Sequence, residues 1–320
     1  MSTKLDSAIL LTLAYSDMFD YPLTEREIYQ LLHTSKVFPE KIVKQHLDNL
    51  VKNQIEQHAA YYCLPGRKSI VELRKKRLKI SQAKLTSVSQ VIQLLGYIPT
   101  IRFVGISGSV AKNNADSNAD IDLFIITKKN TLWFSRAVIL LILELTGKRR
   151  KRQVTDSPNR LCLNYMIDET MLSFSDQRQD IYTSYEIIQL MPVFNQDLTY
   201  EKLIWQNVWI NRYLAHNKRP VYTTCFNQSG IFRQLLSLVC RLLEPLARYL
   251  QLLIISRHIT TETVNAHEAA FHPYDYRYMV LKRINLCEKN MKNYQLWDID
   301  KERRFIYTRR DSRSLQNSVT

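Results

Sequence analysis

The chain has few glycines for its length, only six among 320 residues. Because glycine gives linkers their flexibility, we expect no long flexible linkers between its parts. The glycine-rich phosphate-binding patterns GxxxxGK[ST] and GxGxxG do not occur in the sequence. The metalloprotease pattern HExxH and the hydrolase pattern GxSxG are missing as well. These absences give no support to P-loop, dinucleotide-binding or common hydrolase chemistry.

Cysteine is also sparse. The chain has five, which lie far apart and form no CxxC pair: Cys63, Cys162, Cys225, Cys240 and Cys287. An odd number without close spacing argues against a disulfide scaffold and against a structural zinc site. We therefore expect a protein of the reducing cytoplasm. The apolar stretch near the N-terminus is flanked by Asp6 and Asp17 and is interpreted as a core helix rather than a signal peptide.

Long hydrophobic runs are missing too. In the best membrane candidate, residues 230–256, the longest charge-free run is about eight residues, whereas a spanning helix needs about 20. Polar residues recur there at steps of three and four and form one stripe: Arg233, Ser237, Arg241, Glu244, Arg248 and Gln251. Pro245 should kink this helix or begin a second one. We expect a helix packed in a bundle, so a membrane is not the expected partner; a helix lying on a membrane surface is the alternative.

Positive charge is abundant, with a net charge of +15. Lys and Arg cluster at residues 74–79, at residues 148–152 and in the last 20 residues. Such clusters favour polyanions such as nucleic acid, nucleotides or acidic lipid. The alternative is that they form ordinary solvated helix faces and loop ends.

The first 65 residues have the pattern of a winged helix. A helix over residues 5–18 is followed by Thr24, which begins a capping box with Glu27. A third helix begins after Pro39, and residues 54–58 and 61–64 are expected to form a hairpin. If the third helix lies in a DNA major groove, one exposed face would contact the nucleic acid: Lys41, Lys44, Gln45, Asn49 and Lys52. The nearly neutral charge of this module favours a docking or packing unit instead.

The remaining pattern predicts an α/β (α+β) protein with a small mixed sheet and flanking helices. After the winged-helix-like module, residues 1–66, we expect a helical connector over 67–98. An α/β core over 99–175 should hold strands near 101–107, 120–127 and 160–167. A helical domain over 176–295 and a basic, partly disordered tail over 296–320 complete the chain.

Two aspartates in the α/β core point to chemistry. Asp120 and Asp122 are two residues apart at the start of a predicted strand, so both side chains lie on one face. Two neighbouring carboxylates repel each other, and burying them unpaired is costly. A divalent cation removes that conflict, and Mg²⁺ favours carboxylate oxygens together with substrate phosphates.

A short turn precedes the aspartates. Gly108-Ser109 ends the preceding strand and begins a short helix, where backbone N–H groups and the Ser109 hydroxyl can bind phosphate oxygens. Lys112 can add a charge contact to a triphosphate. Each element is a weak indicator alone, but their conjunction at this spacing is specific.

Residues 108–123 resemble the signature of the nucleotidyltransferase superfamily typified by DNA polymerase β. The match is to the minimal form GSxARG…SDxDL of aminoglycoside-modifying enzymes. The resemblance implies a mixed sheet and Mg²⁺ (or Mn²⁺) held by Asp120 and Asp122. It also implies an NTP whose phosphates are bound by Gly108 and Ser109, and transfer of a nucleoside monophosphate to an acceptor hydroxyl. Segments such as FDYPLT (19–24) and AFHP (270–273) are also similar to bacterial proteins that pair a winged-helix-like module with this domain.

The sequence departs from that family in one important place. The family supplies a third carboxylate from a later strand, where this chain carries Asn164. Asn cannot act as a general base and is a weaker metal ligand. Two hypotheses therefore remain: a nucleotidyltransferase acting on an unidentified hydroxyl acceptor, or a non-catalytic DNA-binding regulator whose degenerate domain senses nucleotides.

Overall fold

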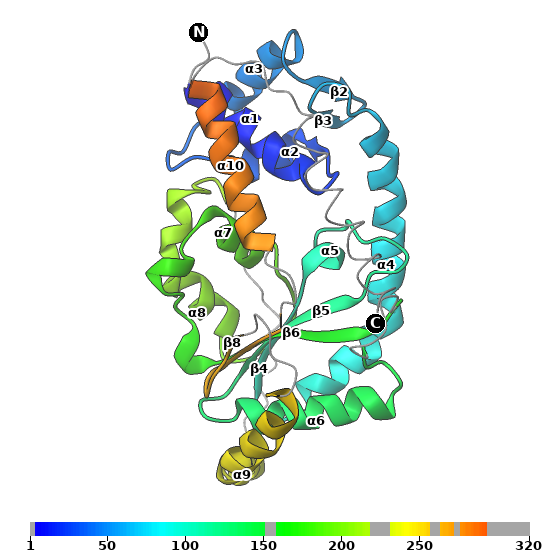
Figure 1. Cartoon of the computed structure of the whole chain (residues 1–320), viewed down its shortest axis with the longest axis vertical. Coiled ribbons are helices and arrows are strands. Elements are labelled where there is room, and N and C mark those ends of the chain that lie inside the picture. The colour runs from blue at the N-terminus through cyan, green and yellow to red at the C-terminus, as the bar shows by residue number, and fades with distance from the viewer. Residues whose placement is uncertain (1–3, 151–157, 218–230, 257–262, 272–275, 293–320) are drawn as a thin grey trace.

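The computed structural model describes residues 4–150, 158–217, 231–256, 263–271 and 276–292. An N-terminal module lies at one end of the molecule and a six-stranded sheet lies toward the other, with one long helix running beside both (Figure 1). The predicted basic tail, residues 296–320, falls outside the described residues.

The N-terminal module contains three helices and a three-stranded antiparallel sheet in the order β1-β3-β2. Its elements are α1 (Lys4–Asp17), β1 (Leu23–Thr24), α2 (Glu25–Gln30), α3 (Glu40–Val51), β2 (Glu56–His58) and β3 (Tyr61–Cys63). The predicted capping box is confirmed, because Thr24 Oγ1 accepts from the Glu27 N–H while the Glu27 carboxylate accepts from the Thr24 N–H. The predicted hairpin is also present; Ala59 makes its turn with a φ of 54°.

The predicted helical connector is a single helix, α4 (Ser69–Gly96). Arg74 donates hydrogen bonds to both carboxylate oxygens of Glu27, at 2.9 and 2.7 Å, and its guanidinium lies over the rings of Tyr21 and Tyr61. Arg77 donates to the backbone carbonyl of Phe19. These two members of the basic cluster at 74–79 therefore bind the N-terminal module to α4.

The main sheet is mixed and has the strand order β7-β4-β5-β6-β9-β8. Its strands are β4 (Ile101–Ser107), β5 (Ile121–Thr127), β6 (Leu161–Asp168), β7 (Met191–Asn195), β8 (Thr263–Val264) and β9 (Glu268–Ala270). β5 and β6 are parallel, and the other neighbours are antiparallel. The α/β class with a mixed sheet is thus confirmed.

One predicted boundary needs correction. Residues 176–295 were expected to form a helical domain, but they supply β7 at one edge of the sheet and β9 and β8 at the other. These strands are only two to five residues long. A hydrophobic pattern this short, between helical segments, does not predict a strand. The pairing of β7 with β4 and of β9 with β6 stabilises these strands in the sheet.

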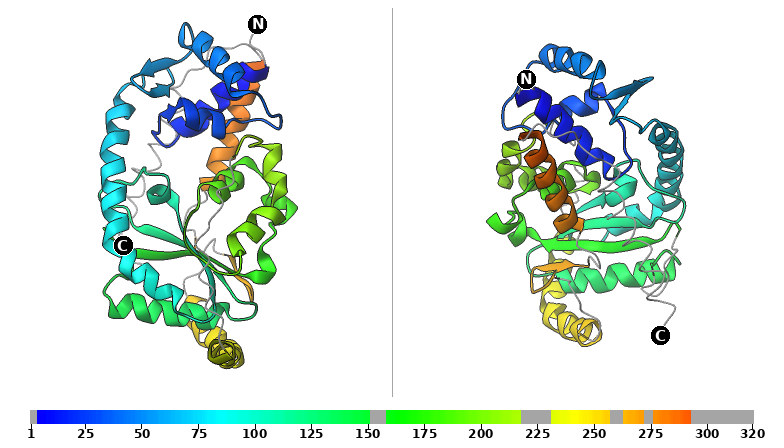
Figure 2. Two further views of the ribbon diagram at one scale, coloured as in Figure 1. Left: turned by 180° about the vertical axis from the view of Figure 1, so that it is seen from behind. Right: turned by 45° about the horizontal axis from the view of Figure 1, so that its top comes forward.

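Helices cover both faces of the sheet (Figure 2). The remaining α-helices are α5 (Gly108–Ala111), α6 (Leu132–Leu145), α7 (Ile181–Ile188), α8 (Thr199–Gln206), α9 (Ile231–Ile255) and α10 (Tyr276–Lys292). Short 3₁₀ helices lie at Glu169–Met171, Asp176–Arg178 and Val208–Arg212. On one face, Ile121, Leu123 and Ile125 of β5 pack with α4 and α6. On the other, Phe124 and Ile126 pack in a cluster that includes α7 and α8.

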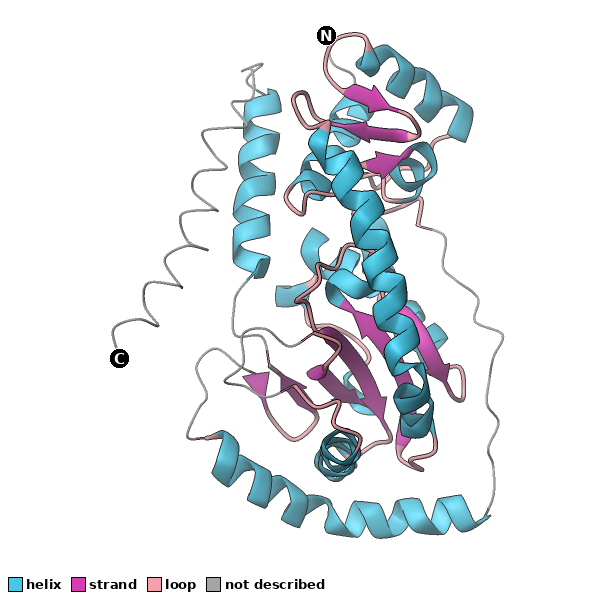
Figure 3. Cartoon of the chain, turned by 90° about the vertical axis from the view of Figure 1, so that its right-hand side faces the viewer, coloured by secondary structure: helices cyan, strands magenta, loops and turns pink. Residues whose placement is uncertain are grey.

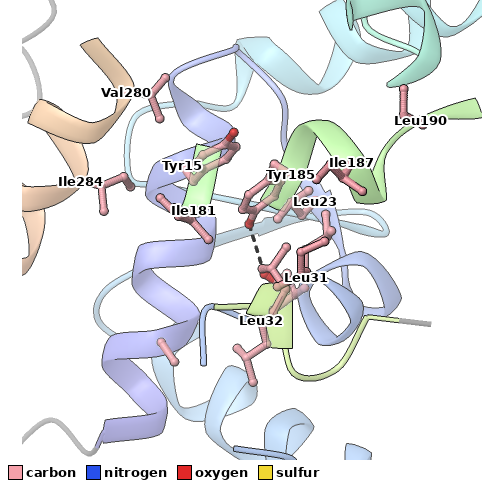
Figure 4. Packing of buried hydrophobic residues seen from close by; sticks show 14 of the residues in the cluster. Tyr15, Leu23, Leu31, Leu32, Ile181, Tyr185, Ile187, Leu190, Val280 and Ile284 are labelled. Carbon is pink, nitrogen blue, oxygen red and sulfur yellow. Dashed lines mark hydrogen bonds between the residues drawn. The ribbon is translucent and has the colours of Figure 1, made fainter. Parts of the chain in front are cut away.

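This second cluster also contains the core of the N-terminal module (Figure 4). Tyr15 of α1 stacks on Tyr185 of α7 with ring centroids 3.7 Å apart, and the Tyr185 hydroxyl donates to the Leu31 carbonyl at 3.1 Å. Val280 and Ile284 of α10 belong to the same cluster. The N-terminal module therefore shares its apolar core with the C-terminal half of the chain.

Residues 231–255 form one helix, α9, with Pro245 inside it, so Pro245 does not begin a second helix. Among the residues that the structure describes, no helix combines the length and the apolar character needed to cross a bilayer.

Candidate functional site

The strand pairing brings the Gly108 turn and the two aspartates together. Ser107, the last residue of β4, pairs with Asp122 of β5, so Gly108 follows directly beside Asp122. Gly108 has a φ of +68°, and a Cβ atom at this position would clash with Asp122 Oδ2. The position therefore requires glycine both for its backbone conformation and for the close approach of the carboxylate.

Asp120 and Asp122 form a compact group with a third side chain, Cys162. A carboxylate oxygen of each aspartate and Cys162 Sγ all lie within 4.8 Å of one another. Cys162 lies opposite Asp122 in the parallel pairing of β5 with β6. The two carboxylates are ligands that suit Mg²⁺ or Mn²⁺, whereas a thiolate suits softer metals. The aspartates therefore fit the predicted cation, and Cys162 is an addition that the sequence did not indicate.

The predicted third position, Asn164, lies at an irregularity of β6. Leu123 pairs with Leu163 and Phe124 with Tyr165, so Asn164 has no partner in the register with β5. Its carbonyl instead accepts from the Phe271 N–H at 2.9 Å. A metal-site role for Asn164 stays a prediction, and the described contacts add no support for it.

The α/β core contains three further acids whose chemistry suits a third carboxylate: Asp116, Asp156 and Asp168. Asp168 pairs with Thr127 at the opposite end of the β5–β6 pair, where its buried carboxylate accepts from Thr170 and Asn130 and contacts His267. Asp116 accepts from backbone N–H groups in its own loop. Asp156 falls outside the described residues.

Arg150 neutralises part of the charge at this site. Its Nη1 donates to Asp120 Oδ2 at 2.5 Å and lies 3.7 Å from Cys162 Sγ. Backbone hydrogen bonds place Arg150 beside Asp120. The Leu161 N–H at the start of β6 donates to the Lys148 carbonyl at 2.7 Å, and the Arg150 N–H donates to the Leu161 carbonyl at 3.1 Å. The basic cluster at 148–152 was visible in the sequence, but its pairing with Asp120 depends on contacts between distant segments.

The electrostatics of the site favour a protonated Asp122 when no cation is bound. Burial, followed by the charge of Asp120, raises the pKa of Asp122 to about 8, although Arg150 and Lys112 oppose the shift. Burial and the same two aspartates raise the pKa of the Cys162 thiol to about 12. A divalent cation would have to displace the Asp122 proton, and it would then remove the repulsion between the carboxylates.

Lys112, a predicted nucleotide contact, is paired within the protein. Its Nζ donates to Glu186 Oε1 at 2.6 Å and lies 5.5 Å from the centroid of the Phe19 ring. The charge of Glu186 also contributes to the raised pKa of Asp122. Glu186 thus adds a carboxylate from α7 to the surroundings of Asp122, and no motif in the sequence indicates this role.

The loop before the aspartates is held by α4. Lys84 is 3% exposed and its Nζ donates to the carbonyls of Ser117 and Ala119, at 2.9 and 2.7 Å. Ser81 Oγ accepts from the Ala115 N–H at 3.1 Å. Because Asp120 follows this loop directly, α4 positions the first aspartate at the entrance of β5.

Comparison with protein-family models, with curated proteins and with solved structures gives no match for this chain.

Replacing Gly108 by Ala should lower the free energy of unfolding by more than the strain of a positive φ alone, because the new Cβ would meet Asp122. Gly66→Ala is the matched control, because Gly66 has a φ of +74° and open space around its missing Cβ. We expect Gly66→Ala to lower the free energy of unfolding by about 1 kcal/mol. Gly108→Ala should cost more and should weaken Mn²⁺ binding at least tenfold, measured by urea unfolding and calorimetry. Equal effects of the two substitutions would contradict the close packing on Asp122.

Asp122→Asn should stabilise the metal-free protein as the pH rises. Folding holds the pKa of Asp122 above its unfolded value, so this group costs stability progressively between about pH 4 and pH 8. The variant should therefore gain on the order of a few kcal/mol over the wild type by pH 8 and much less at pH 5. Urea unfolding in a chelator measures this. Asp48→Asn, which removes an exposed carboxylate, controls for the loss of one charge; a constant Asp122→Asn effect across this range would refute the assignment.

Proposed function

We propose that the chain is a Mg²⁺-dependent nucleotidyltransferase that moves a nucleoside monophosphate from an NTP to a hydroxyl group. The observation that carries the proposal is the pairing of Ser107 with Asp122. It places the Gly108-Ser109 turn, which resembles a phosphate-binding element, directly against the carboxylate pair Asp120 and Asp122. A turn for phosphates beside a site for cations is the arrangement that nucleotide transfer needs.

The chain's own residues would divide the work as follows. Asp120 and Asp122 would hold Mg²⁺ or Mn²⁺, which when bound stabilises negative charge on the α-phosphate and on the leaving pyrophosphate. Gly108 and Ser109 would bind the phosphates through backbone N–H groups and the Ser109 hydroxyl. The acceptor oxygen would attack the α-phosphorus and form a new P–O bond. The bond between the α-phosphorus and the oxygen that bridges to the β-phosphate would break, and pyrophosphate would leave.

Two ion pairs would have to change partners when the nucleotide binds. Arg150 is bound to Asp120 and Lys112 to Glu186 in the free protein. A triphosphate competes for both cations, since phosphate oxygens are strong acceptors of charge-assisted hydrogen bonds. Release of Lys112 would free the Glu186 carboxylate, which is then the candidate to accept the proton of the acceptor hydroxyl. Glu186 would in this way supply the third carboxylate that Asn164 cannot provide.

The order and pairing of the described elements support two finer fold assignments, one for the main sheet and one for the N-terminal module. In the main sheet, β4, β5 and β6 are adjacent and carry the site at the start of β5. In the N-terminal module, the order α1, β1, α2, α3, β2, β3 with an antiparallel β1-β3-β2 sheet supports a winged helix. We assign the first to the nucleotidyltransferase fold and the second to the winged-helix fold as part of this proposal.

A second candidate function is nucleic-acid binding by the N-terminal module. The observation that favours it is the exposure of the predicted reading face of α3, namely Lys41, Lys44, Gln45, Asn49 and Lys52. Against it, Lys44 is paired with Glu25 at 3.2 Å, and Asp48 lies on the same exposed side. A regulator that binds DNA and senses nucleotides would use this face together with the aspartate site.

Removing either aspartate should abolish metal-dependent NTP binding. We expect Asp120→Ala and Asp122→Ala to weaken binding of each NTP at least a hundredfold in the presence of Mn²⁺, because each removes a cation ligand. Asp48→Ala should bind as the wild type does. Calorimetry measures the binding, and incubation with labelled NTPs and a cell extract tests for transfer of label. A wild-type protein that binds no NTP with Mg²⁺ or Mn²⁺ would refute the proposal.

The nucleic-acid candidate predicts binding that depends on the face of α3. Changing Lys41, Lys44 and Lys52 together to Ala should weaken duplex DNA binding at low salt and make it less dependent on salt, because three phosphate contacts are lost. The control changes Lys68, Lys76 and Lys79, which are exposed and precede or lie on α4. Equal loss in both variants, or no mobility shift for the wild type, would reject this candidate.

A further inference from the structure

The helix α9 is attached to the protein by its polar side. The Glu244 carboxylate accepts from the backbone N–H groups of Trp133 and Phe134 at the beginning of α6, at 2.7 and 2.8 Å. Gln251 donates to the Trp133 carbonyl and accepts from Arg136, both at 2.6 Å. The sequence-based expectation of a packed helix is thus only half right, because much of the polar stripe faces the protein.

A second contact fixes the other half of the same stripe. Lys128 Nζ donates to Ser237 Oγ at 2.9 Å, and Ser237 is buried. Cys240 and Ile255 lie on this side and are buried as well. The orientation of α9 is therefore set by contacts along its length and not at one point.

The opposite side of α9 exposes large apolar side chains, which we call the α9 outer face. Its members are 41–73% exposed: Leu235, Leu236, Leu238, Val239, Leu242, Leu243, Leu246, Tyr249, Leu250, Leu253 and Ile254. At 3.6 residues per turn they cover an arc of about 160°, without a charged residue among them. A contiguous exposed apolar face of this kind marks an interaction site.

The width of the α9 outer face indicates what covers it. A helix packed on a protein buries an apolar stripe at least about 100° wide, and a coiled-coil seam is narrower. The α9 outer face takes up nearly half of the helix surface, which suits a flat apolar medium. Figure 3 shows α9 lying lengthwise along the end of the molecule remote from the N-terminal module, where a flat surface can approach it.

Charge supports the same occupant. Arg241 is exposed at the margin of the α9 outer face, and Arg248 is half-buried on the same flank. The one described acid of the helix, Glu244, is 8% exposed and engaged with α6. The whole chain carries a net charge of +15. Helices that lie in a membrane interface combine such an apolar face with cationic residues and are drawn to anionic lipids.

We propose that α9 binds to the surface of an anionic membrane, with the α9 outer face in the boundary between headgroups and acyl chains. The polar stripe, which would face water in an isolated interfacial helix, faces the protein here. The α6 helix and the sheet would then lie on the side of α9 that faces away from the lipid. This inference does not depend on the nucleotide proposal.

Vesicle co-sedimentation tests the proposal on the full chain. The probes are vesicles of phosphatidylcholine alone and vesicles with about 30% phosphatidylserine, whose surface potential attracts Lys and Arg. We expect the wild type to sediment with the anionic vesicles at least tenfold more than with the neutral ones. Replacing Leu242, Leu246 and Leu253 by Glu should reduce that binding at least tenfold.

A matched control changes three exposed apolar residues elsewhere, Val37, Tyr97 and Tyr278, to Glu. This variant should bind as the wild type does, and circular dichroism should show that both triple variants are folded. Failure of the wild type to bind anionic vesicles overturns the proposal. So does a wild-type dimer that the α9 variant abolishes, since a second copy then covers the face, or vesicle binding that appears only after removal of residues 293–320.

Discussion

The repulsion between Asp120 and Asp122 is the constraint on which the rest of the site depends. The β-strand spacing places both carboxylates on one face, and the burial of Asp122 together with the charge of Asp120 raises the pKa of Asp122. Two neighbouring residues accommodate the carboxylates. Arg150 forms an ion pair with Asp120, and the missing side chain of Gly108 leaves room for Asp122. A divalent cation bound at this site would replace the Asp122 proton and compete with Arg150 for Asp120, and it would allow both carboxylates to be ionised together.

The architecture around this pair connects all parts of the chain. α4 binds the N-terminal module through Arg74 and positions the loop before Asp120 through Lys84. α7 contributes Tyr185 to the core of that module and Glu186 to the surroundings of Asp122. The N-terminal module therefore shares its packing with the rest of the chain.

The sequence predicted the features that depend on neighbouring residues. The capping box of Thr24, the three central strands and the opposite faces of β5 all follow from local spacing, and the structure contains them. It did not predict Arg150, Cys162, Glu186 or Lys84 near the aspartates, because each arrives from a distant segment. Asn164 stands where the family resemblance implies a third carboxylate on a later strand, and the pairing of β6 with β5 is irregular at that residue. The orientation of α9 was missed since polar stripes normally face water, whereas here Glu244 caps another helix.

The central claim is that Asp120 and Asp122 hold a divalent cation beside the Gly108-Ser109 turn. Crystals grown with Mn²⁺ and a non-hydrolysable NTP analogue test this most directly, because manganese is located by its anomalous scattering. We expect an anomalous peak bound by oxygens of both aspartates, with triphosphate density at the turn and Arg150 displaced from Asp120. A peak elsewhere, or a nucleotide bound away from this turn while Arg150 stays on Asp120, would contradict it.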